Sequence, residues 1–201
     1  MINFDFFTPT KILFGAGRES EVGKQVAAFG GHKVMIIYGK KGGHIETSGL
    51  LDRVHKSLSD AGLSYVDLNG VVPNPRLSLV KEGIRIGRAE GVDFLLPIGG
   101  GSVIDTAKGI GYGIANDFEM EDLLYGCVKT DKNLPIGVVL TIAAAGSEMS
   151  SSMVLTIEDG MMKRSYGHDC ARPKFAIMNP ELTYSLPAYQ TASGAADIMM
   201  H

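Results

Sequence analysis

The stretch Phe94–Ala107, "FLLPIGGGSVIDTA", places an apolar run directly before three glycines and a serine. The apolar run predicts a buried strand, and the residues after the glycines predict a helix. Glycine lacks a Cβ, so a charged group can approach the backbone closely at such a junction. The free N–H groups and the positive dipole end at the start of a helix suit a phosphate.

Gly99, Gly100 and Gly101 are therefore candidates for a phosphate-binding turn, and Ser102 could cap the helix or donate to a phosphate oxygen. The pattern is neither the dinucleotide fingerprint G-x-G-x-x-G nor a P-loop. A tight strand-to-helix turn with a serine cap, without any ligand, is the alternative interpretation.

Strand-like and helix-like patterns alternate on both sides of this stretch. This alternation predicts an α/β fold, with a parallel sheet buried between helices on both faces. From Ser150 onward the pattern changes to a hairpin around Asp159 and Gly160, one further strand, and a helix after Pro187. We place a domain boundary near Leu186. The predicted strands are 32–39, 63–68, 92–99, 134–142 and 174–179, and the predicted helices are 47–62, 77–91 and 102–116.

Composition and charge exclude several classes of function. The 201 residues are 45% hydrophobic and carry a net charge of −3, with acids and bases interspersed, so we expect no nucleic-acid partner. No run approaches the length of a membrane span, and no signal peptide is evident, so we expect a cytoplasmic protein without a membrane partner.

Cys127 and Cys170 lie far apart and indicate free thiols. The last segment, "TASGAADIMMH", carries no helix-stop signal, so we expect the chain to continue beyond His201.

Two further clusters could take part in chemistry. The segment 141–152, "TIAAAGSEMSSS", is small and hydroxyl-rich and follows a predicted strand. If that strand neighbours the 94–99 strand, both turns face one crevice, although a flexible loop is the alternative. Asp197 and His201 are four residues apart on a predicted helix, so one face could present both to a divalent metal ion. An ordinary exposed pair of side chains is the alternative there.

In this order, the clusters resemble the iron-containing (group III) alcohol dehydrogenase family, and within it the NADP-dependent butanol dehydrogenase type. The resemblance is carried by "PNPR" at 73–76, "LLPIGGGSVIDTAK" at 95–108, "VVLTIAAAGSEMSSS" at 138–152 and "RPKFAIMNPELTYSLPAYQTASGAADIMMH" at 172–201. It implies a Rossmann-like dinucleotide-binding domain at 1–186. Residues 187–201 would then be the first helix of an all-helical, metal-binding domain, with the active site between the two domains.

The resemblance also implies roles for individual residues. Gly99 to Ser102 would hold the cofactor pyrophosphate, and Asp105 matches the family's aspartate after the glycine turn. Thr141 to Ser147 would lie along the cofactor, although many members have a Thr-Thr-Ala-Gly-Thr loop where this chain has Thr141, Ile142, Ala143, Ala144 and Ala145, so fewer hydroxyls are present. Asn74 and Lys163 match positions that line the same cleft. Asp197 and His201 match two of four metal ligands, and the two remaining histidines would lie beyond residue 201.

The cofactor can also be predicted from charge. Relatives that prefer NAD place an acid at the end of the second sheet strand, where it binds the ribose hydroxyl. This chain has Gly39 there, followed by Lys40 and Lys41, which favours the 2′-phosphate of NADP. A solvated lysine turn is the alternative.

The functional prediction is a metal-dependent oxidoreductase that transfers a hydride between NADP(H) and a small primary alcohol or aldehyde. The metal would be iron or zinc, and the family resemblance suggests a homodimer. Two alternatives stay open. The chain alone could be an inactive nucleotide-binding fragment that exposes an apolar face, or it could belong to the dehydroquinate synthase-like lyases, which share the architecture. The spacing of Asp197 and His201 favours the dehydrogenase.

Overall fold

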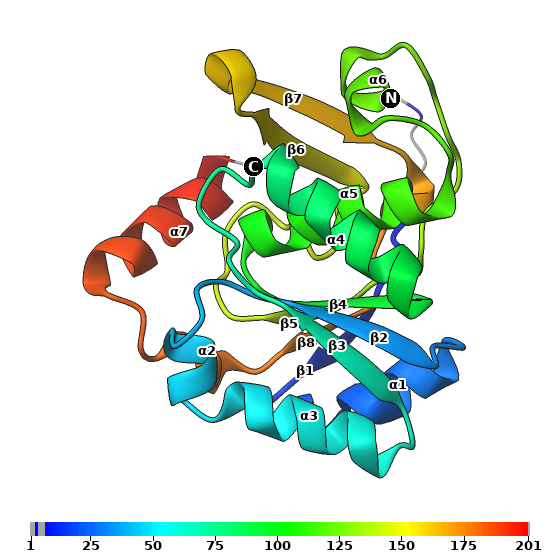
Figure 1. Cartoon of the computed structure of the whole chain (residues 1–201). Helices are drawn as coiled ribbons and strands as arrows, with labels where there is room; N and C mark the ends of the chain where they lie inside the picture. Colours follow the sequence, from blue (N-terminus) through cyan, green and yellow to red (C-terminus); the bar gives the residue numbers. More distant parts are fainter. Residues whose placement is uncertain (1–2, 4–6, 201) are drawn as a thin grey trace.

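The computed structural model describes residue 3 and residues 7–200, and it confirms the α/β class (Figure 1). Within these residues, six parallel strands form one sheet in the order β1-β8-β5-β4-β2-β3. This topology is Rossmann-like, as predicted. The strands are β1 (Lys11–Phe14), β2 (Lys33–Ile37), β3 (Ser64–Leu68), β4 (Phe94–Gly99), β5 (Gly137–Leu140) and β8 (Phe175–Met178).

The central strands are apolar along their whole length because both of their faces are covered. Along β2, Val34 and Ile36 pack on one side of the sheet, whereas Met35 and Ile37 pack on the other. Every residue of β4 is buried, including Phe94 at its start. A strand buried on both faces cannot show polar alternation, so its sequence reads as a continuous apolar run.

Helices cover the two faces of the sheet (Figure 1). One face is covered by α1 (Val22–Ala28) and α3 (Leu50–Asp60), and the other by α4 (Leu77–Glu90) and α5 (Gly101–Ala115). Two short helices, α2 (His44–Thr47) and α6 (Met120–Tyr125), lie in connections. The helix α4 ends as the sequence predicts, because Gly91 takes the left-handed conformation, with φ 67°.

Glycines set the distance between α4 and α5. A Cβ added at Gly83 would lie 2.4 Å from Cδ1 of Ile110 on α5. In the reverse direction, a Cβ at Gly113 would lie 2.1 Å from Cδ1 of Ile84 on α4. Glycine lowers the helix propensity of α5, but it allows α5 to pack closely against α4. Here this packing outweighs the loss of helix propensity.

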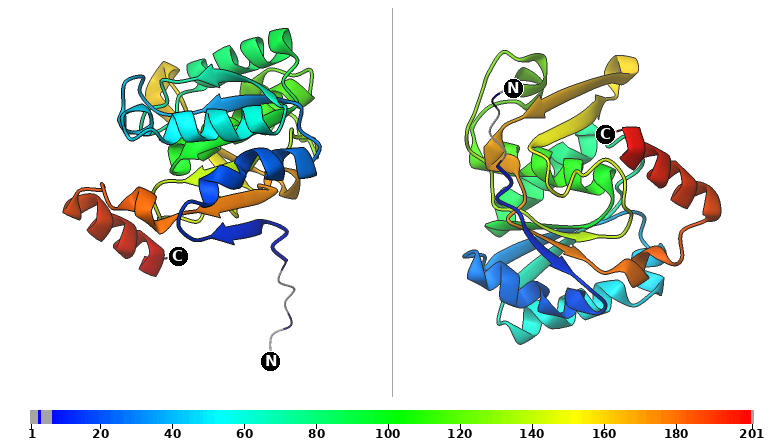
Figure 2. Two further views of the ribbon diagram at one scale, coloured as in Figure 1. Left: turned by 90° about the horizontal axis from the view of Figure 1, so that it is seen from below. Right: turned by 180° about the vertical axis from the view of Figure 1, so that it is seen from behind.

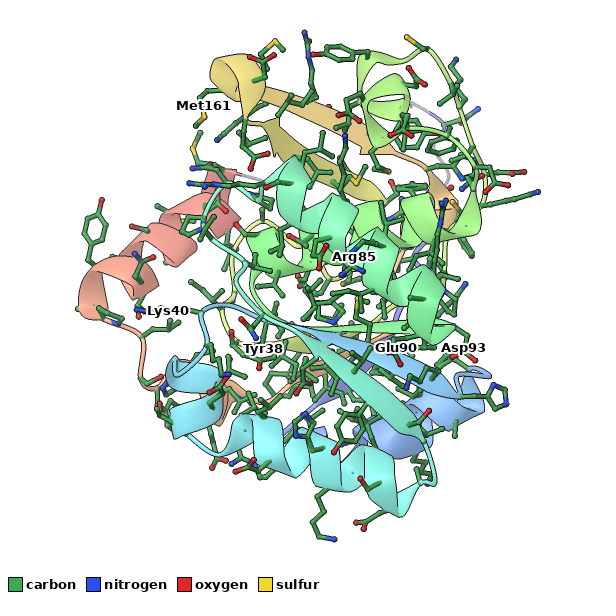
Figure 3. All side chains as sticks on the ribbon, viewed as in Figure 1. Tyr38, Lys40, Arg85, Glu90, Asp93 and Met161 are labelled. Atoms are coloured by element: carbon green, nitrogen blue, oxygen red, sulfur yellow. The ribbon has the colours of Figure 1, made fainter. Side chains whose placement is uncertain are left out.

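The predicted hairpin is present and forms a separate antiparallel pair of strands, β6 (Ser152–Ile157) and β7 (Met162–Gly167). Its turn contains Gly160 at φ 73° and Met161 at φ 50°, which is an uncommon conformation for a non-glycine residue. Figure 3 labels Met161 at the tip of this hairpin, where its side chain is exposed.

The last described helix, α7 (Ala188–Met200), stands at the side of the sheet in both views of Figure 2. Gly194 is the described residue of α7 that is buried, whereas Tyr189, Ile198, Met199 and Met200 are exposed. The boundary near Leu186 that the sequence suggests falls two residues before this helix and stays a prediction. Among the described helices, none is both long and apolar enough to cross a bilayer.

Candidate functional site

The glycine turn lies at the carboxyl end of β4 and at the start of α5. The helix begins at Gly101, with Gly100 as its N-cap in an extended conformation. Within the described residues, no side chain caps this helix, so the predicted capping role of Ser102 is wrong. The physical reason is position: Ser102 is the second residue of the helix rather than the residue before it.

The N–H groups of Val103 and Ile104 donate to the carbonyl of Gly100. The N–H groups of Gly101 and Ser102 have no acceptor among the described residues.

The three glycines differ in what surrounds them. A Cβ at Gly99 would lie 2.5 Å from Cγ2 of Val103, and one at Gly100 would lie 2.4 Å from Cγ2 of Ile142. Packing therefore explains both of these glycines. A Cβ at Gly101 would meet the Cβ of Ser147 at 3.9 Å, an ordinary van der Waals contact, and Gly101 is exposed. Internal packing gives no reason for glycine at 101, so the open space above this residue is the candidate phosphate site.

The hydroxyl-rich segment lies beside this turn, as the sequence suggested it would if the strands were neighbours. Strands β4 and β5 are adjacent, and the N–H of Thr141 donates to the carbonyl of Gly99 over 3.2 Å. Six residues later, Ser147 reaches the open side of Gly101. We name residues 141–152 the serine loop; it contacts the start of α5 through Ile142 and Ser147.

Asp105 lies one turn into α5 and binds the serine loop. Its Oδ1 accepts from the Ser147 hydroxyl at 2.8 Å, and its Oδ2 accepts from the N–H of Val154 at 3.0 Å. Burial raises the pKa of Asp105, while these two hydrogen bonds and nearby Lys108 act in the opposite direction. Asp105 is thus a loop-binding carboxylate at the edge of the candidate site.

Sequence reasoning missed Lys108, which is fully buried and follows Asp105 by three residues on α5. Its ammonium donates to the carbonyls of Ser147 (2.9 Å) and Ser152 (2.7 Å) and to the Ser147 hydroxyl (3.3 Å). Burial lowers the pKa of Lys108 to about 8, although Asp105 and Glu148 act to raise it. A signal was available, because this lysine lies on a helix face between the buried residues Ile104 and Gly111.

Gly39 follows the end of β2, which pairs with β4, so it lies at the same edge of the sheet as the glycine turn. Its carbonyl accepts from the N–H of Gly70 at 2.8 Å. Lys40 and Lys41 are exposed in the turn that follows, and Figure 3 labels Lys40 on the side of the sheet nearest α7. One carboxylate is close: Oε2 of Glu46 accepts from the N–H of Gly42 at 2.9 Å.

Tyr38, the residue before this turn, has a fixed protonation state. Burial raises the pKa of Tyr38 to about 12, and the carboxylates of Glu46 and Asp67 add to the effect. The phenol therefore stays neutral at physiological pH and adds no charge to the edge of the sheet where Gly39 lies. Figure 3 labels Tyr38 in that region.

Asn74 and Lys163 are linked through the hairpin. Asn74 is exposed and takes the left-handed conformation, with φ 58°. The next residue, Pro75, accepts from the N–H of Thr156 on β6 at 2.8 Å, and Thr156 is paired with Lys163 on β7. The N–H of Val154 on the same strand binds Asp105, so the hairpin brings the 74–76 turn and the first turn of α5 to one region. The cofactor contacts that the resemblance implies for Asn74 and Lys163 stay predictions.

A cavity of about 440 Å³ opens beside Thr141 on the opposite face of the sheet. At its wall, the buried carboxylate of Glu19 accepts from Nε of Arg53 and from Nδ2 of Asn179, each at 3.0 Å. Asn179 is itself buried and also accepts from the N–H of Glu181. Sequence reasoning missed this Glu19 cluster, because its members come from three distant segments.

The predicted metal pair is not assembled within the described residues. Asp197 is half-buried on α7, and His201 lies outside the residues that the structure describes. No group of three or more His, Cys, Asp or Glu side chains gathers anywhere in residue 3 and residues 7–200. One carboxylate does not make a metal site, so the described part of the chain does not by itself fit a catalytic metal ion.

Fold and turn together define a Rossmann-like α/β domain with an open helix N-terminus at the carboxyl edge of its sheet. The sequence profile of the family described as "Iron-containing alcohol dehydrogenase" matches residues 9–180. The chain belongs to this family.

The relatives agree with this assignment. NADH-dependent butanol dehydrogenase A of Clostridium acetobutylicum is 41% identical over 201 residues, covering 100% of this chain and 51% of that protein. NADPH-dependent aldehyde reductase YqhD of Escherichia coli is 35% identical over 205 residues, covering 100% and 51%. The crystal structure of NADH-dependent butanol dehydrogenase A from Thermotoga maritima matches with a TM-score of 0.95 and 38% identity, covering 99% of this chain and 50% of that one.

Two facts bear on how these relatives compare with this chain. The chain spans about half the length of the curated relatives it matches. The relatives are also named for different cofactors, since NADH-dependent enzymes at 40–41% identity stand beside an NADPH-dependent one at 35%.

Proposed function

We propose that this chain is the dinucleotide-binding part of an oxidoreductase that transfers a hydride between a nicotinamide cofactor and a primary alcohol or aldehyde. The observation that carries the proposal is the start of α5. There Gly101 is free of internal packing, and two N–H groups have no acceptor within the described residues. A cofactor pyrophosphate placed there would accept from these N–H groups and lie at the positive end of the helix.

The chain's own residues would bind and orient the cofactor, and a bound nicotinamide would supply the hydride chemistry. In this proposal Gly101 and Ser102 hold the pyrophosphate. The serine loop, fixed by Asp105, closes one side of the site. Asn74 and Lys163 line the other side, as the family resemblance implies.

For the cofactor, we propose NADP(H). Gly39 replaces the acid that would bind the ribose hydroxyl of NAD, and two exposed lysines follow it. Glu46 binds the backbone N–H of Gly42 and keeps its negative charge, so it offsets part of the charge of the two lysines in this turn. This proposal differs from the names of the relatives at 40–41% identity, so it depends on charge alone.

For the metal, we propose that Asp197 and His201 provide two ligands to iron or zinc, and that the remaining ligands come from outside these 201 residues. No step of the reaction is assigned to the metal, because the described residues do not form its site. Residues 1–186 would then be the cofactor domain, and 187–201 the start of the metal-binding one.

A second candidate function is dinucleotide binding without turnover by this chain alone. It is favoured by the missing metal cluster among the described residues and by the exposed Tyr189, Met199 and Met200 of α7. A chain of this length could hold the cofactor without a complete place for the alcohol.

The test is a titration of the 201-residue chain with NADPH and with NADH, followed by nicotinamide fluorescence and by calorimetry. We expect saturable binding at one site, with NADPH the tighter ligand. A parallel assay adds butyraldehyde, with and without Zn²⁺ or Fe²⁺, and follows oxidation of the cofactor. Binding with turnover supports the oxidoreductase, and binding without turnover supports the second candidate. If neither dinucleotide binds, the proposed function is wrong.

A further inference from the structure

Lys108 is a buried cation that the proposed hydride chemistry does not use. Its side chain is fully buried, which is rare for lysine, and all three partners of its ammonium lie in the serine loop. Two of those partners are backbone carbonyls, at Ser147 and Ser152. The lysine therefore joins the rigid helix α5 to two separate points of an irregular loop.

The serine loop needs such a partner because it has little regular structure of its own. Residues 141–151 form neither helix nor strand, so their backbone carbonyls lack the ladder that pairs carbonyls elsewhere. Asp105 and Arg172 hold the same loop: Asp105 binds the Ser147 hydroxyl, and Arg172 donates to the carbonyl of Met149 at 2.8 Å. Lys108 is the one of these three that reaches both Ser147 and Ser152.

Burial of the ammonium of Lys108 opposes its ionisation. Burial lowers its pKa to about 8, so the folded protein binds this proton less readily than an exposed lysine would. The charged groups that face the ammonium are Asp105 on α5, Glu148 in the loop and Arg172 beyond the hairpin. The role in placing the loop follows from the hydrogen bonds of Lys108 to Ser147 and Ser152.

The position that Lys108 fixes borders the candidate phosphate site. Ser147, which receives two of its three hydrogen bonds, is the residue that faces the open side of Gly101. A shift of Ser147 toward Gly101 would close the space for the pyrophosphate. A shift away from Gly101 would remove the wall of that space.

We propose that Lys108 is a positioning residue that sets the affinity for the nicotinamide dinucleotide by holding the serine loop at the start of α5. This inference deepens the proposed function and depends on it. Lys108 is buried beneath the loop and acts through Ser147 and Ser152, without touching the cofactor itself.

The test compares Lys108→Met with the parent chain, and uses Lys56→Met as the matched control. Lys56 is an exposed lysine on α3 whose ion pair with Asp60 lies outside the site. We expect Lys108→Met to weaken NADH binding about tenfold or more, because charged hydrogen bonds to the loop are lost. Hydrogen exchange at pH 7.5 should become faster in peptides covering 141–152 and stay unchanged in β2 and β4. The control should match the parent chain in both measurements.

A pH series separates positioning from general damage. NADH serves as the probe because it lacks the 2′-phosphate. In the parent chain, NADH affinity should fall as pH rises from 7 to 9.5, since the ammonium loses a donor and its charge near pH 8. In Lys108→Met the affinity should be weak and flat over the same range. A parent affinity that is flat as well would contradict the proposal.

Other outcomes are also decisive. If Lys108→Met binds NADH like the parent chain and keeps its loop protected from exchange, Lys108 does not position the loop. Should that variant fail to fold, hydrogen exchange of the parent chain gives a second test. After correction for the intrinsic effect of pH, peptides covering 141–152 should lose protection relative to β2 and β4 between pH 7.5 and 9.5, and unchanged relative protection would overturn the proposal. If the parent chain binds no dinucleotide, the proposed function fails, and loop exchange still decides whether Lys108 holds the loop.

Discussion

Replacing Gly101 by alanine should separate the binding role of the glycine turn from its structural role. The added Cβ has its nearest neighbour at 3.9 Å, and the residue is already helical, so no strain is introduced. Alanine is a better helix former than glycine by up to about 1 kcal/mol, so the variant should be at least as stable as the parent. The same methyl group would stand where a pyrophosphate must approach the backbone.

The expected loss of affinity follows from the hydrogen bonds at this helix start. Two N–H groups, of Gly101 and Ser102, are available there. Losing one charge-assisted hydrogen bond is worth about 1.5–3 kcal/mol, which corresponds to roughly 10- to 150-fold in Kd. The assay is a fluorescence titration with NADPH alongside thermal unfolding by circular dichroism.

Gly113→Ala is the matched control on the same helix. Its Cβ would lie 2.1 Å from Cδ1 of Ile84, so this variant should lose about 1–3 kcal/mol of stability by overpacking. It should keep the affinity of the parent, because Gly113 is at the far end of α5. If Gly101→Ala binds NADPH within twofold of the parent, or is destabilised as much as Gly113→Ala, the assignment of the phosphate site is wrong.

Three further predictions concern charge. Asn179→Asp would place a second carboxylate beside buried Glu19 and should lower stability by about 1–3 kcal/mol at pH 8. Urea unfolding at pH 8 and pH 5 should show a smaller loss at pH 5, where one of the two carboxylates can take up a proton; an equal loss at both would contradict the reasoning. Because the folded pKa of Lys108 is about 8 against 10.5 ordinarily, the unfolded chain binds more protons between these values, and stability should rise with pH across that window. Unfolding at pH 7.5 and 9.5 should show this rise in the parent chain and not in Lys108→Met. The double variant Lys40→Ala, Lys41→Ala should weaken NADPH binding about tenfold and leave NADH binding within twofold; equal effects on both cofactors would reject the proposed NADP preference.

Much of the fold could be predicted because the strong patterns are local. The apolar strands, the hairpin at Asp159 and Gly160, and the stop of α4 at Gly91 all depend on neighbouring residues. Strand β1 was missed because it is an edge strand of four residues, with a single buried position at Leu13. Such a strand shows neither a continuous apolar run nor clear alternation. Helices α1 and α6 were missed as well, and both are shorter than two full turns.

The parts of the candidate site that lie at strand ends could be predicted from the sequence. The parts that depend on tertiary contacts could not. The glycine turn and the serine loop could be placed together, since neighbouring parallel strands end at one edge. Which glycine is open could not be known, because that depends on Val103 and on Ile142 from another segment. Likewise, the helix face of Lys108 indicates that it is buried, but its partners at 147 and 152 could not be known, because they belong to an irregular loop.

The glycine contacts between α4 and α5 have a consequence for how this protein can change. With Ile110 seated against Gly83, and Ile84 against Gly113, neither helix can rotate or slide without a collision between side chain and backbone. Alanine, which usually strengthens helices, is therefore excluded at positions 83 and 113. The first turn of α5, where the candidate phosphate site lies, is therefore held in place by the packing of the rest of the helix against α4.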